Sequence, residues 1–427
     1  MTRTAFYADY VWYNNKIHTN THLLVDGDTI AGIAEHPSDD FKIEKFANSA
    51  IFPGLVNTHT HLPMGLFRGM ADDLPLMEWL QKHIWPAEGK WLSPEFIQAA
   101  TDLAAVEMIK SGTTLSNDMY FLSDFIAESI RKSGLKGVVG VGVLDFPTKF
   151  GNNADDYITN ASKLCEKYKG DELISVSLCP HAPYTVNPEN YTKCVEFCAK
   201  HGLVLHTHLM EADHESADSV AKYGKTTVQI MNEVGAFDIK SIFAHCVQLN
   251  DEEIALMGEK KVSVAHCIQS NMKLANGFAP VKKMMDAGIN VTIGTDGAAS
   301  NNDLDMIDET RSVALVHKGV LKDATALSAD TVLHMATSCG AKALAVDNTG
   351  ELKKGNKADF IAVSFDSPKT TPVFNPVSHL VYSASASDVT AMYVNGKCLM
   401  KDRVILTVDE EKIKYNARAW AEKIKKG

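Results

Sequence analysis

The stretch that decides the fold lies between residues 203 and 302 and holds four short apolar runs: LVLHTHLME (203–211), SIFAHCVQL (241–249), KVSVAHCIQS (261–270) and INVTIGTDGAASNN (289–302). Each run is rich in Val, Ile, Leu or Ala and has the length of a buried strand. Segments with helical periodicity separate the runs. Strands that alternate with helices pair into a parallel sheet, because each helix returns the chain to the end at which the strand began.

The same alternation extends toward the N-terminus. The earlier runs are AIFPGLVNTHTH (50–61), TTLSNDMY (113–120), KGVVGVGVLDF (136–146) and LISVSLCPHAPYT (173–185). Helical periodicity predicts helices near 93–111 and 121–133, between these runs. About eight βα units fit a closed (β/α)8 TIM barrel, so we expect an α/β fold of that class.

Both ends of the chain show a different pattern, with apolar and polar residues alternating between turn signals. The N-terminal runs are ADYVWYNN (8–15) and HLLVDGDTIAGIAEH (22–36), and the C-terminal runs are NTGELKKGNKADFIAVSF (348–365) and VTAMYVNGKCLMKDR (389–403). Asp-Gly and Asn-Gly within them indicate hairpins. We therefore expect residues 1–54 plus 352–427 to form a small composite β-sandwich domain, and 55–351 to form the barrel. The tail from Asp409 is expected to be helical.

Composition narrows the class of protein and its partners. The 427 residues are 45% hydrophobic and carry a net charge of −11, with no basic stripe of the kind that nucleic-acid binders show. No stretch approaches the roughly 20 apolar residues that span a bilayer. The eight cysteines are scattered without a CxxC pair, which is typical of reduced thiols. We expect a cytoplasmic protein that binds a small molecule and neither nucleic acid nor membrane.

The first candidate metal ligands are His59 and His61, at the end of the run 50–61. Side chains two residues apart on a strand point the same way, so both imidazoles can reach one ion. A pair of polar residues at a strand end is the alternative interpretation.

Three later runs also end in candidate ligands: His206 and His208 in one, His245 in the next, and Asp296 in the last. The carboxyl ends of barrel strands converge on one mouth, where active sites are built. A lone histidine is usually structural, but this convergence of several strand ends favours a metal site. Imidazole and carboxylate ligands without thiolate suit Zn2+, with Fe2+ or Mn2+ as alternatives.

Two further residues could act on a substrate. Glu211 lies three residues beyond His208, where a carboxylate could move a proton between water and a leaving group. Its alternative is an ordinary acidic residue at the start of a helix. His181, in CPHAPYT, could donate a hydrogen bond to a substrate ring nitrogen, or could simply be a loop histidine held between prolines.

Five long motifs resemble the methylthioadenosine/S-adenosylhomocysteine deaminases of the amidohydrolase superfamily, which are related to triazine chlorohydrolases. They are NTHTHLPMGLFRGMADDLPLMEWLQKHIWPAE (57–88), PHAPYT (180–185), HTHLMEADHE (206–215), SNMKLANGFAPV (270–281) and GTDGAASNNDLDM (294–306). The resemblance extends over almost the whole chain. It implies a homo-oligomer, a dimer or tetramer, with one zinc ion per subunit held by His59, His61, His208 and Asp296.

The resemblance also implies the roles of the remaining residues. His245 would hydrogen-bond the attacking water or the tetrahedral oxygen, Glu211 would protonate the ring nitrogen, and Asp296 would take the proton from water. His181 matches a position that contacts the substrate, and Glu88 matches one that binds ribose hydroxyls. The expected reaction converts an adenosine-type nucleoside to its inosine analogue plus ammonia.

The expected substrate depends on one departure from the family pattern. Family members that prefer S-adenosylhomocysteine carry arginines after the third barrel strand, whereas this chain has Lys136 and Lys149 in that region. Lysine supplies charge without the bidentate guanidinium fork, which favours methylthioadenosine or adenosine. Whether Lys136 or Lys149 replaces the arginines stays open. The alternatives are a guanine, cytosine, pterin or triazine hydrolase, and a metal-free scaffold protein.

Overall fold

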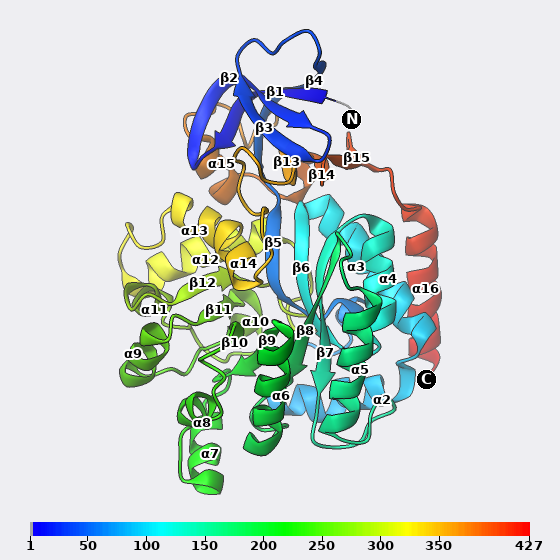
Figure 1. Ribbon diagram of the computed structural model, residues 1–427, viewed down its shortest axis with the longest axis vertical. Coiled ribbons are helices and arrows are strands. Elements are labelled where there is room, and N and C mark those ends of the chain that lie inside the picture. The colour runs from blue at the N-terminus through cyan, green and yellow to red at the C-terminus, as the bar shows by residue number, and fades with distance from the viewer. Residues whose placement is uncertain (1–2) are drawn as a thin grey trace.

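Two eight-stranded sheets organise the computed structural model, which describes residues 3–427 (Figure 1). One sheet is a parallel barrel, and the other is a mixed sheet built from both ends of the chain. The predicted fold class, a (β/α)8 barrel with a small β-domain from both chain ends, is confirmed. Among residues 3–427, no helix combines the length and apolar character that crossing a bilayer requires.

The barrel strands follow one another in sequence order, each parallel to the next. They are β5 (Leu55–Thr60), β6 (Thr113–Tyr120), β7 (Lys136–Val143), β8 (Ile174–Pro180), β9 (Val204–Leu209), β10 (Ser241–His245), β11 (Ser263–His266) and β12 (Asn290–Ile293). Nearly every residue in them is buried, as expected for strands inside a ring of helices. Side-chain and backbone bonds join the first strand to the last: Thr58 Oγ1 donates to the Ile293 carbonyl at 2.8 Å, and Asp296 N donates to the His59 carbonyl at 2.9 Å.

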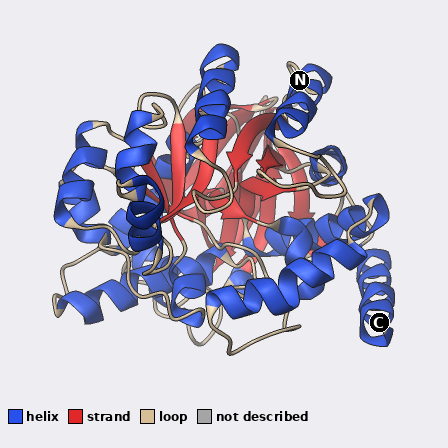
Figure 2. Ribbon diagram, turned by 90° about the horizontal axis from the view of Figure 1, so that it is seen from below, coloured by secondary structure: helices blue, strands red, loops and turns tan. Residues whose placement is uncertain are grey.

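Helices surround the barrel (Figure 2). They are α3 (Pro94–Ser111), α4 (Ser123–Ser133), α5 (Ala154–Lys167), α6 (Pro188–His201), α7 (Glu215–Tyr223), α8 (Thr227–Glu233), α9 (Asp251–Glu259), α10 (Ile268–Lys273), α11 (Val281–Asp286), α12 (Met306–Leu321), α13 (Ala329–Met335) and α14 (Ser338–Ala343). Their boundaries follow ordinary capping chemistry. The Ser93 side chain accepts from Phe96 N at the start of α3, and Gly112 ends that helix at φ 91°.

A group of short elements follows β5 and precedes α3 in the sequence, and it lies at the carboxyl end of the barrel. They are the 3-10 helix η1 (Leu62–Phe67), α1 (Leu76–Trp79), the π-helix η2 (Leu80–Ile84) and α2 (Trp85–Trp91). Such π segments are rare and are often found at functional sites. These elements bring several apolar side chains to the mouth of the barrel.

The mixed sheet has the strand order β16-β15-β14-β13-β4-β1-β2-β3. Its strands are β1 (Arg3–Tyr13), β2 (Lys16–Asp26), β3 (Thr29–Ala34), β4 (Lys42–Pro53), β13 (Phe360–Ser364), β14 (Val389–Val394), β15 (Lys397–Lys401) and β16 (Val404–Ile405). The predicted turns are present, since Gly27 separates β2 from β3, and Asn395 and Gly396 connect β14 to β15 with positive φ values. The remaining elements are α15 (Pro376–Tyr382), η3 (Ala386–Asp388) and α16 (Glu410–Lys426).

The alternation of residues along the mixed sheet separates two cores. Phe52 and Ile361 pack into the large core that continues into the barrel, whereas their neighbours Ile51 and Phe360 face a smaller core. In that smaller core the ring of Phe6 lies 4.9 Å from the ring of Phe360, edge to face. One side of the sheet therefore supports the barrel, and the other encloses its own apolar cluster.

Gly54 joins the two sheets, between β4 and β5. A Cβ atom at this position would lie 2.1 Å from Thr114 Oγ1, so only glycine lets the chain pass so close to β6. A buried ion pair forms a second connection, in which Lys136 Nζ donates to Asp359 Oδ2 at 2.5 Å. The predicted division at residues 54/55 and 351/352 stays a prediction.

The C-terminal tail forms the expected helix. Asp409 caps α16 by accepting from Lys412 N at 3.0 Å. The helix, red in Figure 1, lies beside α3, and the ring of Trp420 meets that of Phe96 edge to face at 5.3 Å. This contact attaches the tail to the barrel.

Candidate metal and active site

A cavity of about 490 Å³ opens at the carboxyl ends of the barrel strands. Seven of the eight residues proposed for the site line it: His61, Glu88, His181, His208, Glu211, His245 and Asp296. The eighth, His59, is fully buried and belongs to the same cluster of side chains. The structure therefore brings all eight residues together at one mouth.

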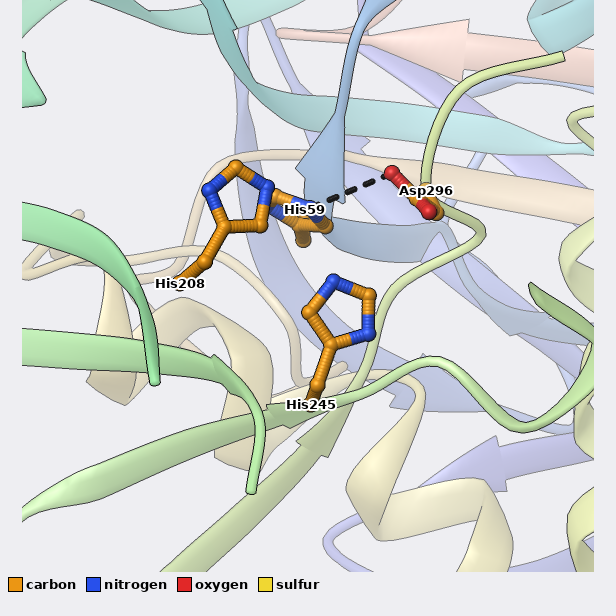
Figure 3. Close-up of side chains that lie close together, drawn as sticks. All are labelled: His59, His208, His245 and Asp296. Carbon is orange, nitrogen blue, oxygen red and sulfur yellow. Dashed lines mark ion pairs between the residues drawn. The ribbon is translucent and has the colours of Figure 1, made fainter. Parts of the chain in front are cut away.

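Donor atoms of His59, His208, His245 and Asp296 all lie within 4.8 Å of one another (Figure 3). His61 extends this group, because its Nε2 lies 3.2 Å from Asp296 Oδ1 and 3.3 Å from His208 Nε2. His59 Nε2 is buried and has no hydrogen-bond partner within residues 3–427. A buried nitrogen without a partner, next to a carboxylate and further imidazoles, fits a site for a divalent metal ion.

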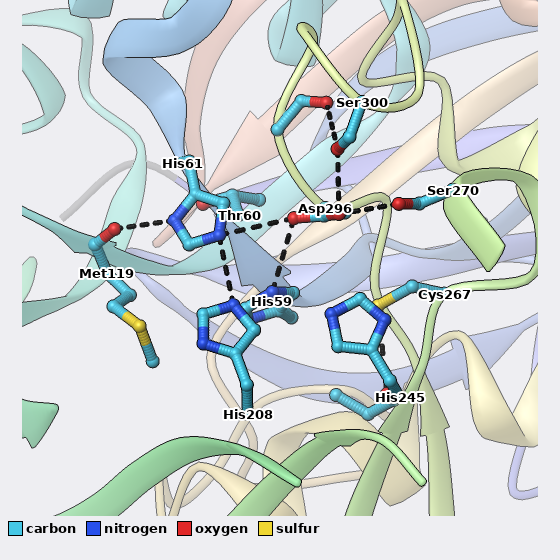
Figure 4. Close-up of polar contacts among 12 residues, drawn as sticks. His59, Thr60, His61, Met119, His208, His245, Cys267, Ser270, Asp296 and Ser300 are labelled. Atoms are coloured by element: carbon cyan, nitrogen blue, oxygen red, sulfur yellow. Dashed lines mark hydrogen bonds and ion pairs between the residues drawn. The ribbon is translucent and has the colours of Figure 1, made fainter. Parts of the chain in front are cut away.

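Hydrogen bonds on the far side of each ligand fix its orientation, and Figure 4 shows those of His61 and Asp296. The Nδ1 atom of His61 contacts the Met119 carbonyl at 2.6 Å, and that of His208 contacts the His181 carbonyl at 2.7 Å. Because a carbonyl only accepts, each Nδ1 carries the proton, and Nε2 of a neutral ring is left unprotonated toward the cluster.

Asp296 is held in the same way. Its Oδ2 accepts hydrogen bonds from the hydroxyls of Ser270 at 2.6 Å and Ser300 at 2.7 Å. Its Oδ1 is left to face the histidines, 3.3 Å from His59 Nε2 and 3.2 Å from His61 Nε2. One oxygen of the carboxylate thus anchors the side chain, while the other is available to a ligand.

The electrostatics of the cluster match a cation site. Burial lowers the pKa of His59 to about 4 and that of His208 well below its usual value. Burial would raise the pKa of Asp296, but the nearby imidazoles of His59 and His61 outweigh it and hold that pKa well below the usual range. Burial also lowers the pKa of His61, yet the hydrogen bond and charge of Asp296 raise it to about 9. A cation bound here would replace that proton.

Glu211 and His245 face each other beside the cluster. Glu211 Oε2 lies 3.7 Å from His245 Nε2, and burial raises the pKa of Glu211 to about 7. On the other side of its ring, His245 Nδ1 contacts Asn271 Oδ1 at 2.9 Å. A carboxyl group that titrates near neutral pH is suited to proton transfer.

The backbone at the strand ends is strained around these residues. Met210, His245, Cys246 and Asp296 all have positive φ values, from 50° to 73°. Residues other than glycine adopt this region at a cost, and such residues gather at functional sites. Here the strain coincides with the points at which β9, β10 and β12 deliver Glu211, His245 and Asp296 to the cavity.

Glu88 and His181 lie on the walls of the cavity. Tyr120 Oη donates to Glu88 Oε1 at 2.6 Å, and burial raises the pKa of Glu88 to about 7. His181 Nδ1 contacts Thr185 Oγ1 at 2.9 Å, which leaves its Nε2 free to meet a bound molecule. Both residues can therefore offer hydrogen bonds to a ligand that also reaches Glu211.

The rest of the lining is mainly apolar, and it includes Leu76, Trp79, Leu80, Ile84, Trp85 and Phe150. Of the two lysines considered at the arginine positions, Lys149 lines the cavity. Lys136 does not, because it begins β7 and is paired with Asp359 at the opposite end of the barrel. Lys136 therefore cannot replace a carboxylate-binding arginine.

Sequence reasoning placed His206 among the ligand candidates, and the structure assigns it a different position. His206 Nε2 contacts His59 Nδ1 at 2.8 Å, and His206 Nδ1 accepts from Asn117 Nδ2 at 3.0 Å. The two His-Thr-His motifs are alike in spacing, but β9 sits in a different register from β5. Its second histidine reaches the cluster, and its first lies one layer deeper, beneath His59.

Other supporting residues were missed, namely Glu215, Ser270, Asn271, Asn276 and Ser300. Glu215, Ser270 and Asn271 lie at the starts of the short helices α7 and α10, and Asn276 and Ser300 lie in loops. These stretches beyond the strand ends are too short for periodicity to indicate which side chains turn inward. The polar motif SNMKLAN (270–276), which begins four residues after the strand that ends at His266, could have indicated Ser270, Asn271 and Asn276. Polar residues just beyond a barrel strand lie at the face where active sites are built.

Comparison with known proteins gives one consistent result. Residues 50–399 match the amidohydrolase family. The chain is 42% identical to a 5-methylthioadenosine/S-adenosylhomocysteine deaminase from Thermodesulfovibrio yellowstonii, over 98% of each protein. It is also 42% identical to a 5'-deoxyadenosine deaminase from Methanosarcina acetivorans, over 95% of this chain and 94% of that protein.

Solved structures agree with this result. The crystal structure of an adenosine deaminase from Xanthomonas campestris with bound zinc superimposes with a TM-score of 0.95. The two chains are 38% identical, and the match covers 100% of this chain and 99% of the other. The chain belongs to the amidohydrolase family, in the group of the 5-methylthioadenosine/S-adenosylhomocysteine deaminases.

Proposed function

We propose that this chain hydrolyses the exocyclic amino group of an adenosine-type nucleoside: 5'-methylthioadenosine, adenosine or S-adenosylhomocysteine. The products are the inosine analogue and ammonia. The observation that carries the proposal is that one cavity joins the His/Asp cluster to a carboxyl group that titrates near neutral pH, Glu211. The same cavity holds Glu88 and His181, at positions that can bind ribose and purine.

The proposed metal ligands are His59, His61, His208 and Asp296, and the proposed ion is one zinc per subunit. Iron and manganese are the alternatives that the same donor set allows. When bound, such an ion supplies Lewis acidity and lowers the pKa of water from 15.7 toward roughly 7. His245 is proposed to contact the reacting oxygen rather than to act as a fifth ligand.

The residues of the chain then move the protons. Asp296 accepts a proton from the attacking water, and Glu211 donates one to the ring nitrogen next to C6, which makes that carbon more electrophilic. A C–O bond forms at C6. The proton taken up by Asp296 then passes to the amino group, the C–N bond breaks as ammonia leaves, and the hydroxyl proton of the intermediate returns to Glu211 as the C6 carbonyl forms. His245 hydrogen-bonds the oxygen throughout.

Substrate orientation is proposed to depend on two further residues. His181 donates a hydrogen bond from Nε2 to a purine ring nitrogen, while its Nδ1 accepts from the Thr185 hydroxyl. Glu88 accepts from the ribose hydroxyls, with its carboxyl group held by Tyr120. The apolar wall next to Glu88 covers the remainder of the nucleoside.

The test is ammonia release by zinc-loaded protein from methylthioadenosine, S-adenosylhomocysteine, adenosine, guanine and cytosine. Turnover of an adenosine-type nucleoside should fall by roughly 10²- to 10⁴-fold in Glu211→Gln, the range that general acid–base catalysis supplies. Glu253→Gln is the matched control, because Glu253 is also buried but closes the capping box of α9, a role that glutamine also fills.

Other outcomes would redirect the proposal. Turnover of guanine or cytosine alone would move the chain to a different substrate class, and chloride release from a chlorotriazine would indicate a chlorohydrolase. Purified protein without metal, inactive after addition of zinc, would indicate a scaffold protein and contradict the catalytic assignment.

We further propose the organisation of the chain as a cytoplasmic homo-oligomer, a dimer or tetramer, in which each subunit divides into two domains. Residues 1–54 and 352–427 would form the β-domain, and 55–351 the barrel. The participation of both chain ends in one sheet supports this division. Light scattering tests the oligomeric state, and limited proteolysis with cleavage near residues 54 and 351 would support the domain boundaries.

A further inference from the structure

Glu211 is held by contacts that the proposed mechanism does not use. The carboxylate of Glu215 accepts three successive backbone N–H groups, from Met210 at 2.9 Å, Glu211 at 2.8 Å and Ala212 at 2.9 Å. Met210 has a φ of 52°, so the chain turns sharply at this point. These bonds fix the backbone from which the Glu211 side chain enters the cavity.

A second contact fixes the side chain itself. Asn276 Nδ2 donates to Glu211 Oε1 at 2.9 Å, whereas Oε2 lies 3.7 Å from His245 Nε2. An amide NH2 group only donates, so Oε1 must act as an acceptor. The proton of a neutral Glu211 therefore sits on Oε2, the oxygen on the side of His245.

Asn276 is in turn held by its own backbone. Its N–H donates to the Asn271 carbonyl at 2.9 Å, and its carbonyl accepts from Gln248 Nε2 at 2.6 Å. Asn271 is also the residue whose Oδ1 contacts His245 Nδ1. The segment that follows β11 thus orients the two proton-handling groups delivered by β9 and β10.

We propose that Asn276 is a positioning residue that keeps the transferable proton of Glu211 on Oε2, facing the substrate. The inference rests on the proposed role of Glu211 as the proton donor to the ring nitrogen. Without the amide, the carboxyl group can rotate and can carry its proton on Oε1, turned away from the cavity. Substrate binding does not need this contact, so its loss should affect the chemical step.

The first test compares Asn276→Ala with Asn276→Asp. We expect kcat to fall roughly 10- to 100-fold with KM within about 2-fold of wild type, as for other losses of catalytic positioning. Asp should be the worse variant although it matches Asn in size, because a second carboxylate attracts the Glu211 proton to Oε1. A purely structural role predicts the opposite order, and that order would overturn the proposal.

The matched control is Asn290, whose Nδ2 donates to Ser263 Oγ and the Cys339 carbonyl at the start of β12, away from the cavity. Asn290→Ala and Asn290→Asp remove similar amide bonds and should leave kcat unchanged in the folded protein. Equal losses of kcat in both pairs would indicate a general effect on folding and would also overturn the proposal.

A double-mutant cycle tests whether Asn276 acts through Glu211. In a Glu211→Gln background no carboxyl proton remains to be placed, so adding Asn276→Ala should lower kcat by less than about 2-fold. If the two losses multiply instead, Asn276 acts independently of Glu211, which would contradict the proposal.

A spectroscopic readout separates failure of this inference from failure of the proposed function. Below the Glu211 pKa of about 7, the protonated carboxyl group gives an infrared C=O band that Glu211→Gln removes. Asn276→Ala should shift this band to higher frequency, because the carbonyl oxygen loses its donor. A shifted band in a protein that deaminates no substrate would support the contact between Asn276 and Glu211 and contradict the proposed function. An unshifted band in an active enzyme would contradict the positioning role of Asn276 and leave the proposed function intact.

Discussion

The floor and the wall of the cavity are built on different principles. The floor consists of His59, His61, His208, His245 and Asp296, which come from strand ends, are buried, and are each held by a further hydrogen bond. The wall consists of apolar side chains from the short elements at 76–92 and from the segment 144–150. Its charged groups are few, chiefly Glu88 and Lys149.

This difference separates two tasks. A floor of fixed donors is preorganised for one type of chemistry, because moving any ligand would break bonds on both of its sides. An apolar wall gains affinity from contact area and discriminates weakly between similar ligands. The floor should therefore determine the reaction, and the wall should rank the substrates. Substitutions in the floor should change kcat and metal content, whereas substitutions in the wall should change KM.

The largest effect is expected at Asp296. Asp296→Asn keeps the shape but removes the charge and the proton acceptor, so kcat/KM should fall by about 10⁴-fold, at the upper end for a group that transfers protons. Initial rates of ammonia release measure it. Ser270→Ala, which removes only one donor to Oδ2, should cost far less. If Asp296→Asn kept more than a tenth of wild-type activity, the proposed role of the floor would be contradicted.

The second effect concerns the layer beneath the floor. His206→Phe removes the partner of His59 Nδ1, so the ring loses its fixed tautomer. Zinc affinity should fall by roughly 10- to 100-fold, as is usual for the outer partners of metal ligands. Competition with a chromophoric chelator measures the affinity without an assay of activity. His317→Phe is the control, since His317 is a buried histidine that contacts His266 outside the site. Unchanged affinity in His206→Phe would show that the deeper layer does not support the ligand.

The floor was largely predictable from the sequence, because strand periodicity determines which residues reach the carboxyl end of a barrel. His59, His61, His208, His245 and Asp296 all lie at or just after such ends. Depth along the strand was not predictable. It depends on the register between neighbouring strands, and for that reason His206 was grouped with His208.

The wall could not be derived in the same way. An apolar residue satisfies the same pattern whether it packs in the core or lines a cavity. Leu62, Met64 and Phe67 from one short helix all pack in the buried core, but of these three only Met64 also lines the cavity. The π-helix at 80–84, from which Leu80 and Ile84 line the cavity, also has no sequence signature.

The third effect is a pH dependence of substrate binding that arises from Glu88 in the wall. Burial raises the pKa of Glu88 to about 7, so the ionised form, which accepts from both ribose hydroxyls, exists mainly above that pH. As pH falls through 7, KM should rise, by about 10-fold at one unit below the pKa. Glu88→Gln should have a raised KM without this pH dependence. With 2',3'-dideoxyadenosine, which lacks the hydroxyls, wild-type KM should also be independent of pH in this range, and a dependence there would point to another group.

The smallest effect is expected at Lys149, the one lysine of the two considered that lines the wall. A solvated lysine attracts a carboxylate weakly and lacks the bidentate geometry of arginine, so the contact should be worth no more than about 1 kcal/mol. Lys149→Met should lower kcat/KM for S-adenosylhomocysteine by at most about 5-fold and leave methylthioadenosine unchanged. Lys163→Met, on the neighbouring helix α5, is the control for a general loss of positive charge. A much larger loss that is confined to S-adenosylhomocysteine would show that the wall carries a true carboxylate site. In that case the division of tasks between floor and wall would have to include charge recognition as well as contact area.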